Sequence, residues 1–256
     1  MRPFPQIDDP HRVFRAIRLP TARFLDFGRV SRISAPLPRL VPSSQPLLST
    51  LLSLGIDQDT HVIIYDQHGL TFGASRAWWL LRLFGHHRSS VLDGGLTAWL
   101  NAGFPCAQGE PEMPDVKAPG TWRLVRRRSM VISRPQVEHA LRAGTAAVVD
   151  VRPEAYYRGE APELLSDVAP GHIPGSINLP FPDLLDGPSA RLLPPSGITA
   201  RLEAAGAPSA LPVIATCSIG VIGCTLALAL QTIGRRWSMH DEGWADWQRG
   251  HASAAA

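Results

Sequence analysis

Two stretches of the sequence decide the fold, "HVIIYDQHGLTFGASRAWWLLRLFGHHRSSVLDGGLTAWLNAGFP" (61–105) and "PVIATCSIGVIGCTLALALQTIGRRWSMHDEGWADWQRG" (212–250). Each contains a β-branched strand, a loop with glycine, a helix that ends near glycine, a short strand, and then Asp and Gly before a last helix. When the first strands are aligned, Asp66 takes the place of Cys217. A pattern that occurs twice predicts two similar structural units.

Strands that alternate with helices in this order predict βαβ units, and therefore the α/β class. We expect two domains, each a mostly parallel sheet with helices on its faces. The predicted N-terminal domain covers 1–110, a linker covers 111–125, and the C-terminal domain covers 126–256. The linker lies in a stretch rich in Pro and Gly without hydrophobic periodicity, "CAQGEPEMPDVKAPGTW" (106–122).

The second domain has a further helix and strand ahead of its repeat, "SRPQVEHALRAG" (133–144) and "AAVVDV" (146–151). The first domain has no room for both. We therefore expect the first domain to be truncated at its N-terminus, without an edge strand or a first helix.

The composition of the 256-residue chain is that of a globular protein, with 45% hydrophobic residues and a formal net charge of +3. One dense basic cluster, "RLVRRR" (123–128), is expected to be solvated, so no nucleic-acid partner is predicted. Three cysteines favour a reducing compartment over a disulfide framework. No apolar run reaches the roughly 18 residues of a membrane span, and the start lacks the apolar core of a signal peptide. The sequence predicts a cytoplasmic protein with no membrane partner.

Cys217 ends an apolar strand and precedes a helix, so the loop between them presents backbone N–H groups to the sulfur. Such groups, with the positive end of a helix dipole, stabilise a thiolate and are expected to lower its pKa. The predicted cradle consists of the five residues after the cysteine, namely Ser218, Ile219, Gly220, Val221 and Ile222. The alternative is that Cys217 is a small buried core residue.

Cysteine loops of this kind also serve two other kinds of chemistry. A cysteine-dependent phosphatase needs Arg six residues after its cysteine to bind phosphate oxygens, and position 223 is Gly. Cys217 and Cys224 could form a redox pair if their sulfurs faced each other.

Asp241, at the end of a strand, is expected to cap the following helix.

Six stretches together resemble one family, the tandem-domain rhodaneses, which include thiosulfate and 3-mercaptopyruvate sulfurtransferases. They are "HVIIYD" (61–66), "ASRAWWLLRLFGHH" (74–87), "LDGGLTAWL" (92–100), "VVDVRPEAYYRGEAPE" (148–163), "GHIPGSINLPF" (171–181) and "PVIATC" (212–217). The resemblance implies a rhodanese-like fold in each domain, an inactive first domain with Asp66 in place of cysteine, and a Cys217 that carries persulfide sulfur. It implies no metal and no organic cofactor.

The chain departs from the family pattern at five positions. The acid of the first domain is Gly28, two arginines that grip substrate are Tyr156 and Leu165, and two polar loop residues are Ile219 and Ile222. Two nearby arginines remain as candidate ligands for the carboxylate or sulfonate of a donor, Arg152 and Arg158.

The resemblance therefore implies a sulfurtransferase that moves a sulfane sulfur from a donor like thiosulfate or 3-mercaptopyruvate to a thiophilic acceptor. The expected partners are a small-molecule sulfur donor and a thiol acceptor, and the expected state is a monomer. The alternative is a catalytically silent rhodanese-like module for interaction or regulation. The five departures favour the silent module, whereas Cys217 and its loop glycines favour an enzyme.

Overall fold

The computed structural model describes residues 9–30, 41–69, 71–113, 115–116, 120–187 and 189–252. The first half contains α1 (Pro10–Ala16), α2 (Phe27–Val30), α3 (Ser44–Ser53), β1 (Val62–Ile64), α4 (Phe72–Leu83), β2 (Ser89–Val91) and α5 (Gly95–Asn101). Strands β1 and β2 pair in parallel, as the repeat predicts. Before β1, the described residues contain no regular strand, only an isolated bridge between Arg18 and Ala107. The expected truncation of the first domain at its N-terminus stays a prediction.

The second half is larger. Its elements are η1 (Arg128–Met130), α6 (Arg134–Ala143), β3 (Ala147–Asp150), α7 (Glu154–Tyr157), β4 (Ile177–Asn178), η2 (Phe181–Leu184), β5 (Leu185–Asp186), β6 (Arg191–Leu192), α8 (Pro195–Ala204), β7 (Val213–Thr216), α9 (Gly223–Thr232), β8 (Trp237–Met239) and α10 (Gly243–Ala252). A four-stranded parallel sheet has the order β4-β3-β7-β8, and β5 and β6 form a separate antiparallel pair. The predicted α/β class is therefore confirmed.

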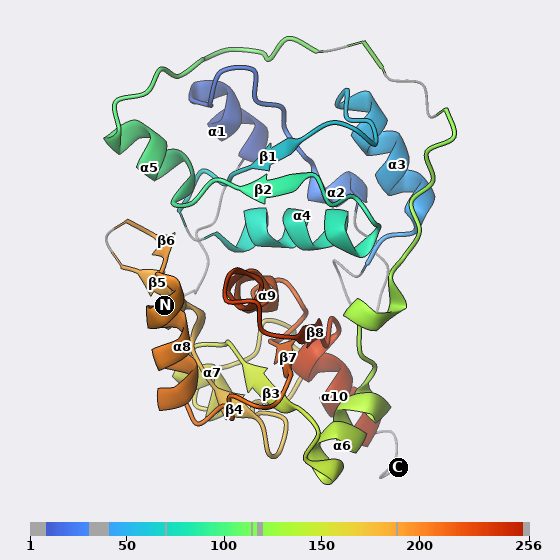
Figure 1. Cartoon of the computed structure of the whole chain (residues 1–256), viewed down its shortest axis with the longest axis vertical. Coiled ribbons are helices and arrows are strands. Elements are labelled where there is room, and N and C mark those ends of the chain that lie inside the picture. The colour runs from blue at the N-terminus through green and yellow to red at the C-terminus, as the bar shows by residue number, and fades with distance from the viewer. Residues whose placement is uncertain are drawn as a thin grey trace.

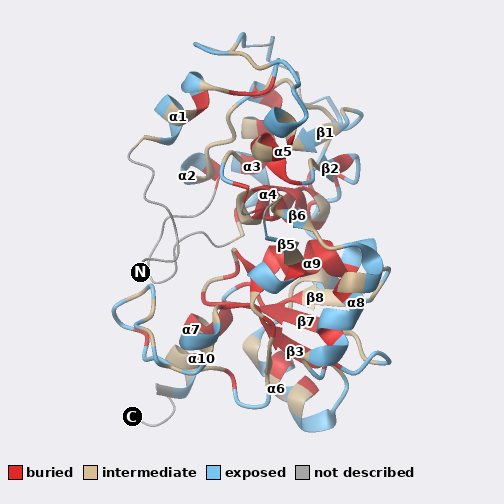
Figure 2. Cartoon of the chain, turned by 90° about the vertical axis from the view of Figure 1, so that its left-hand side faces the viewer, coloured by how far each residue is buried: buried red, intermediate tan, exposed pale blue. Residues whose placement is uncertain are grey.

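Helices cover both faces of this sheet because successive strand residues point to opposite sides. Val148 and Ile214 pack with the apolar faces of α6 and α10. Their neighbours Val149 and Ala215 pack with α8 and α9. Figure 2 shows the sheet as a buried layer between these helices. The carboxyl ends of β3 and β7 therefore lie side by side, where the candidate site is built.

The two halves meet through equivalent helices. Helix α4 follows β1, helix α9 follows β7, and the two pack against each other at the centre of the molecule (Figure 1). Trp78, Trp79 and Leu226 are buried in one hydrophobic cluster that extends from α4 through α9 to the larger sheet. The described parts of the connection from α5 to α6 run along the outside (Figure 1). The domain boundaries at 110 and 126 stay predictions.

None of the described helices is both long enough and apolar enough to cross a bilayer.

Candidate active site around Cys217

Cys217 lies directly after β7 and six residues before the start of α9, with 1% of its surface exposed. Its sulfur is hydrogen-bonded by the backbone N–H groups of Ile219, Gly220 and Gly223. Ile219 and Gly220 belong to the predicted cradle, and Gly223 is the first residue of the helix. The site can therefore hold a sulfur anion by backbone groups and by the amino end of a helix.

The pKa of Cys217 differs from the sequence expectation. Burial raises the pKa of the thiol, and the nearby charge of Asp150 raises it further. The three N–H groups lower the pKa, as expected, but they do not outweigh burial. The expectation that the loop makes Cys217 a low-pKa thiol was wrong, because burial of the sulfur removes water from the charged form.

Gly220 is needed at its position for two reasons. Its φ of +78° lies in the left-handed region, and a Cβ atom there would lie 2.0 Å from the carbonyl oxygen of Asp241. Gly223 is constrained by contact alone, since a Cβ atom would lie 2.5 Å from the Cε atom of Met239. The loop therefore requires glycine at position 220, whereas at position 223 the flexible side chain of Met239 could move to make room.

Gly220→Ala is therefore expected to lower the free energy of unfolding by about 2–4 kcal/mol, because backbone strain adds to overpacking against Asp241. The matched control is Gly206→Ala, since Gly206 has φ +86° but no heavy atom within 4 Å of its Cβ position. Urea denaturation of both variants measures the difference. Equal losses in the two variants would show that the contact with Asp241 adds nothing.

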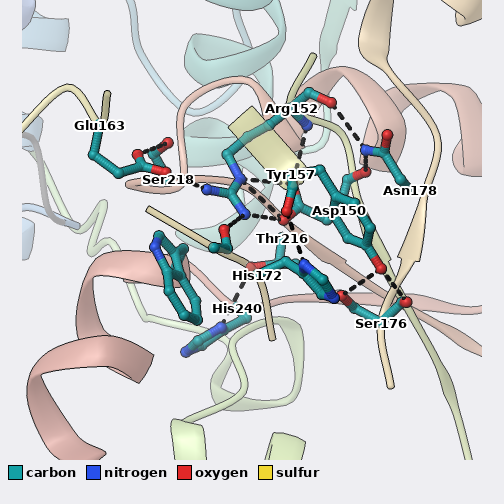
Figure 3. A network of polar contacts seen from close by, with 12 residues as sticks. Asp150, Arg152, Tyr157, Glu163, His172, Ser176, Asn178, Thr216, Ser218 and His240 are labelled. Atoms are coloured by element: carbon teal, nitrogen blue, oxygen red, sulfur yellow. Dashed lines mark hydrogen bonds and ion pairs between the residues drawn. The ribbon is translucent and has the colours of Figure 1, made fainter. Parts of the chain in front are cut away.

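Asp150, Arg152 and Glu163 form a buried network of charged groups (Figure 3), and Cys217 is close enough to act electrostatically on Arg152. The Nε and Nη2 atoms of Arg152 donate to the carboxylate of Asp150, at 2.9 and 2.6 Å from Oδ2. Its Nη1 atom donates to Oε1 of Glu163, and its Nη2 atom also donates to the carbonyl of Gly171 at 2.9 Å. Arg152 is 1% exposed, and two carboxylates hold its guanidinium in the interior.

This arrangement changes the interpretation of Arg152. A guanidinium whose donors are taken up by Asp150, Glu163 and Gly171 has little left to offer a donor anion. Arg158 is exposed and pairs with Glu154 one helical turn away. The roles of Arg152 and Arg158 as donor ligands stay predictions, and the contacts of Arg152 speak for a structural role.

Glu163 connects the network to the cysteine loop. Its Oε2 atom accepts a hydrogen bond from the hydroxyl of Ser218 at 3.1 Å (Figure 3). Burial raises the pKa of Glu163, while Arg152 and Ser218 act in the opposite direction. This hydrogen bond from Ser218 thus fixes the Cys217 loop to the segment that follows α7.

The hollow next to the loop is small, with a volume of about 10 Å³. Its lining is mostly apolar and consists of Arg152, Pro153, Tyr156, Leu164, Phe181, Ser218 and Ile222. Such a volume holds about one water molecule.

Two of the five departures from the family pattern, Tyr156 and Ile222, form part of the wall of this hollow. Of the other three, Leu165 and Ile219 pack on the cluster formed by α6 and α10, and Gly28 is exposed in α2.

The first half contacts the Cys217 loop through Arg76 of α4. The Arg76 guanidinium forms a buried ion pair with Asp241 and donates to the carbonyl of Gly220 at 3.1 Å. Asp241 was expected to cap α10, and this was wrong because its carboxylate pairs with Arg76 of the other half. The thiol of Cys224 also donates to the Gly220 carbonyl, at 3.4 Å. Burial raises the pKa of Cys224 to about 12, so this thiol is protonated and has a structural role.

The equivalent loop of the first half holds a carboxylate in the place of the thiol. The Asp66 side chain accepts hydrogen bonds from the backbone N–H groups of Gly69, Thr71 and Ala74. Burial nevertheless raises the pKa of Asp66. The first half thus keeps the anion cradle of the repeat without a nucleophilic sulfur.

The model of the rhodanese-like domain matches this chain twice, over residues 8–102 and 133–250. The chain belongs to the rhodanese family. Human 3-mercaptopyruvate sulfurtransferase is 32% identical over 242 residues, which cover 93% of this chain and 80% of the human protein. Bovine thiosulfate sulfurtransferase is 35% identical over 234 residues, which cover 90% of this chain and 76% of the bovine one.

Solved rhodanese structures agree with this assignment. The crystal structure of SseA from Escherichia coli, described as a 3-mercaptopyruvate sulfotransferase, superposes with a TM-score of 0.80 at 30% identity, covering 93% of this chain and 87% of that one. The resemblance deduced from the sequence is therefore confirmed for the family and the fold.

Sequence reasoning about this rhodanese missed Arg76 and Glu163 as parts of the site. A signal for Arg76 was present, because it is a charge within the apolar helix "ASRAWWLL" (74–81). A charge on a buried helix face predicts a buried partner of opposite sign. Glu163 carries no such signal, since it lies in the irregular segment after α7.

Proposed function

We propose that this chain is a sulfurtransferase that carries sulfane sulfur as a persulfide on Cys217. The observation that carries the proposal is the convergence of three backbone N–H groups on the sulfur of Cys217, at the amino end of α9. Backbone donors in a low-dielectric site stabilise an anion without reorganisation. The relatives' names, thiosulfate sulfurtransferase and 3-mercaptopyruvate sulfurtransferase, support the same chemistry.

In the loading step, the Cys217 thiol loses its proton and the thiolate attacks the outer sulfur of the donor. One S–S bond forms to Cys217, and the bond between that sulfur and the rest of the donor breaks with its electron pair on the leaving group. The proton is taken up by the leaving group or the persulfide. In the second step, a thiol acceptor attacks the outer sulfur, and Cys217 leaves as a thiolate. The three N–H groups stabilise the anion at both stages.

The identity of the donor is a finer proposal. Thiosulfate and 3-mercaptopyruvate are the donors to test first, with a small thiol as acceptor. Cys217 is buried and its neighbouring hollow has only about 10 Å³, so either donor must displace side chains at the rim. Leu164 is the rim residue with most room to move, since it is 43% exposed. The cytoplasmic location and the monomeric state stay predictions.

Incubation of the pure protein with each donor is expected to raise its intact mass by about 32 Da, the mass of one sulfur atom on a cysteine. Cys217→Ala should abolish this gain because it removes the attacking sulfur. Cys106→Ala is the matched control and should keep the gain, since Cys106 lies on the first half, near the end of α5. Mass spectrometry of the intact chains measures the result.

A gain that persists in Cys217→Ala would contradict the role of this cysteine. No gain with either donor would favour the silent rhodanese-like module. A thiol count that falls by two after mild oxidation, with a disulfide between Cys217 and Cys224, would favour the redox pair.

A further inference from the structure

A second and larger hollow lies between the two halves, with a volume of about 450 Å³. The first half contributes residues of α4 and β2 to its lining, and the second half contributes the segment around β6 and the last turns of α9. Its volume is in the range of small-molecule sites. It lies at the carboxyl end of α9, whereas Cys217 precedes the amino end, about 15 Å away by the rise of a ten-residue helix.

Arg82 brings a positive charge to this hollow. Its guanidinium lies over the ring of Trp78, 5.3 Å from the centroid, and both residues line the hollow. In the described part of the chain, no carboxylate forms an ion pair with Arg82. Burial lowers the pKa of Arg82, and the positive charge of Arg127 lowers it further. Among the residues that the structure describes, the charge of Arg82 therefore has no counter-ion.

The basic cluster of the sequence explains this local excess of charge. The N–H of Arg127 donates to the carbonyl of Leu83 at 2.8 Å, which fixes the segment 123–128 at the end of α4. Burial lowers the pKa of His87, and the charges of Arg127 and Arg82 lower it further. Arg127 thus adds a positive charge close to Arg82, although it does not itself line the hollow.

Ser89 adds a polar group that lacks a partner. It is 8% exposed and lines the hollow, and its hydroxyl makes no hydrogen bond to the residues that the structure describes. Its oxygen atom is itself buried, so Ser89 lines the hollow with its other atoms and the contact with an anion falls to Arg82. The lining also contains one acid, Asp93, whose carboxylate accepts the N–H of Leu192 at 2.8 Å.

We propose that this hollow binds a small organic anion, a carboxylate on a flat apolar body. The carboxylate meets the Arg82 guanidinium, whose N–H groups can bond to both of its oxygens. The apolar body lies against Trp78 and the wall formed by Leu193, Pro194 and Leu228. Because its lining comes from both halves, an occupant holds the two halves together.

The probe for this site is 1-naphthoate, with neutral 1-naphthamide as its uncharged counterpart. Calorimetric titration of the full chain is expected to show saturable binding of one 1-naphthoate, at least tenfold tighter than the amide. Arg82→Met should weaken 1-naphthoate binding at least tenfold, since it keeps the apolar stem and removes the charge.

The matched control is Arg88→Met. Arg88 is exposed, lies next to Ser89 and does not line the hollow, so its loss changes the net charge equally without touching the site. Absence of saturable 1-naphthoate binding would overturn the proposal. So would binding that Arg82→Met leaves intact, or that Arg88→Met weakens as much. Cys217→Ala should bind 1-naphthoate normally, so the result does not depend on sulfur transfer.

Discussion

Replacing Arg76 with methionine is expected to lower the free energy of unfolding by about 3–5 kcal/mol, the usual cost of removing one partner from a buried ion pair. Arg76 and Asp241 are 2% and 3% exposed, so the variant leaves a carboxylate in the interior without its cation. The carbonyl of Gly220 also loses the hydrogen bond from Arg76. Urea denaturation measures the loss, and persulfide loading should slow because Gly220 belongs to the cradle of Cys217.

Two further variants separate the ion pair from ordinary packing. Arg82→Met makes the same change on the same helix at a residue with no ion pair in the described chain, and it should cost less than about 1 kcal/mol. Arg76→Met combined with Asp241→Asn should recover much of the lost stability, because no unpaired charge remains. If the double variant is as unstable as Arg76→Met alone, the unpaired carboxylate is not the cause.

The repeat made most of the fold predictable. Alternation of β-branched strands with apolar helices is a local property, and it located β1, α4, β2 and α5 in the first half and β7, α9, β8 and α10 in the second. The position of Cys217 at the end of a strand followed from the same pattern. Gly220 and Gly223 were identified because glycine lets a loop approach a sulfur atom closely, and in the structure a Cβ atom at Gly220 would meet the backbone of Asp241.

The partners of the buried charges were not predictable in this way. Asp241 looks like a helix cap from its sequence neighbours, but its partner is Arg76, 165 residues earlier in the chain. Arg152 looks like a free anion ligand, yet Glu163 reaches it from an irregular segment and Asp150 from β3. Pairing of charges depends on tertiary contacts, so the local pattern shows that a charge is buried without showing what it meets.

Such pairing also governs the network beside Cys217, where one cation faces two carboxylates. Arg152→Met is expected to lower the free energy of unfolding by about 3–5 kcal/mol near neutral pH, because Asp150 and Glu163 would both be left buried without their cation. Glu163→Gln is the matched variant in the same network. It removes one negative charge and leaves Asp150 paired with Arg152, and the amide can still bond to Ser218.

The pH dependence of these two variants tests the assignment. The pKa of Glu163 is raised in the folded chain, so its ionisation costs stability, and this cost appears as the pH rises above the unfolded value of about 4.5. Glu163→Gln removes that cost and should match or exceed the wild type in stability at neutral pH. In Arg152→Met, the pKa of Glu163 rises further because the cation that lowered it is gone, so the deficit of this variant should grow from about pH 5 to about pH 8. Urea denaturation at both pH values measures the deficit, and a deficit that does not change with pH would show that Arg152 acts by packing alone.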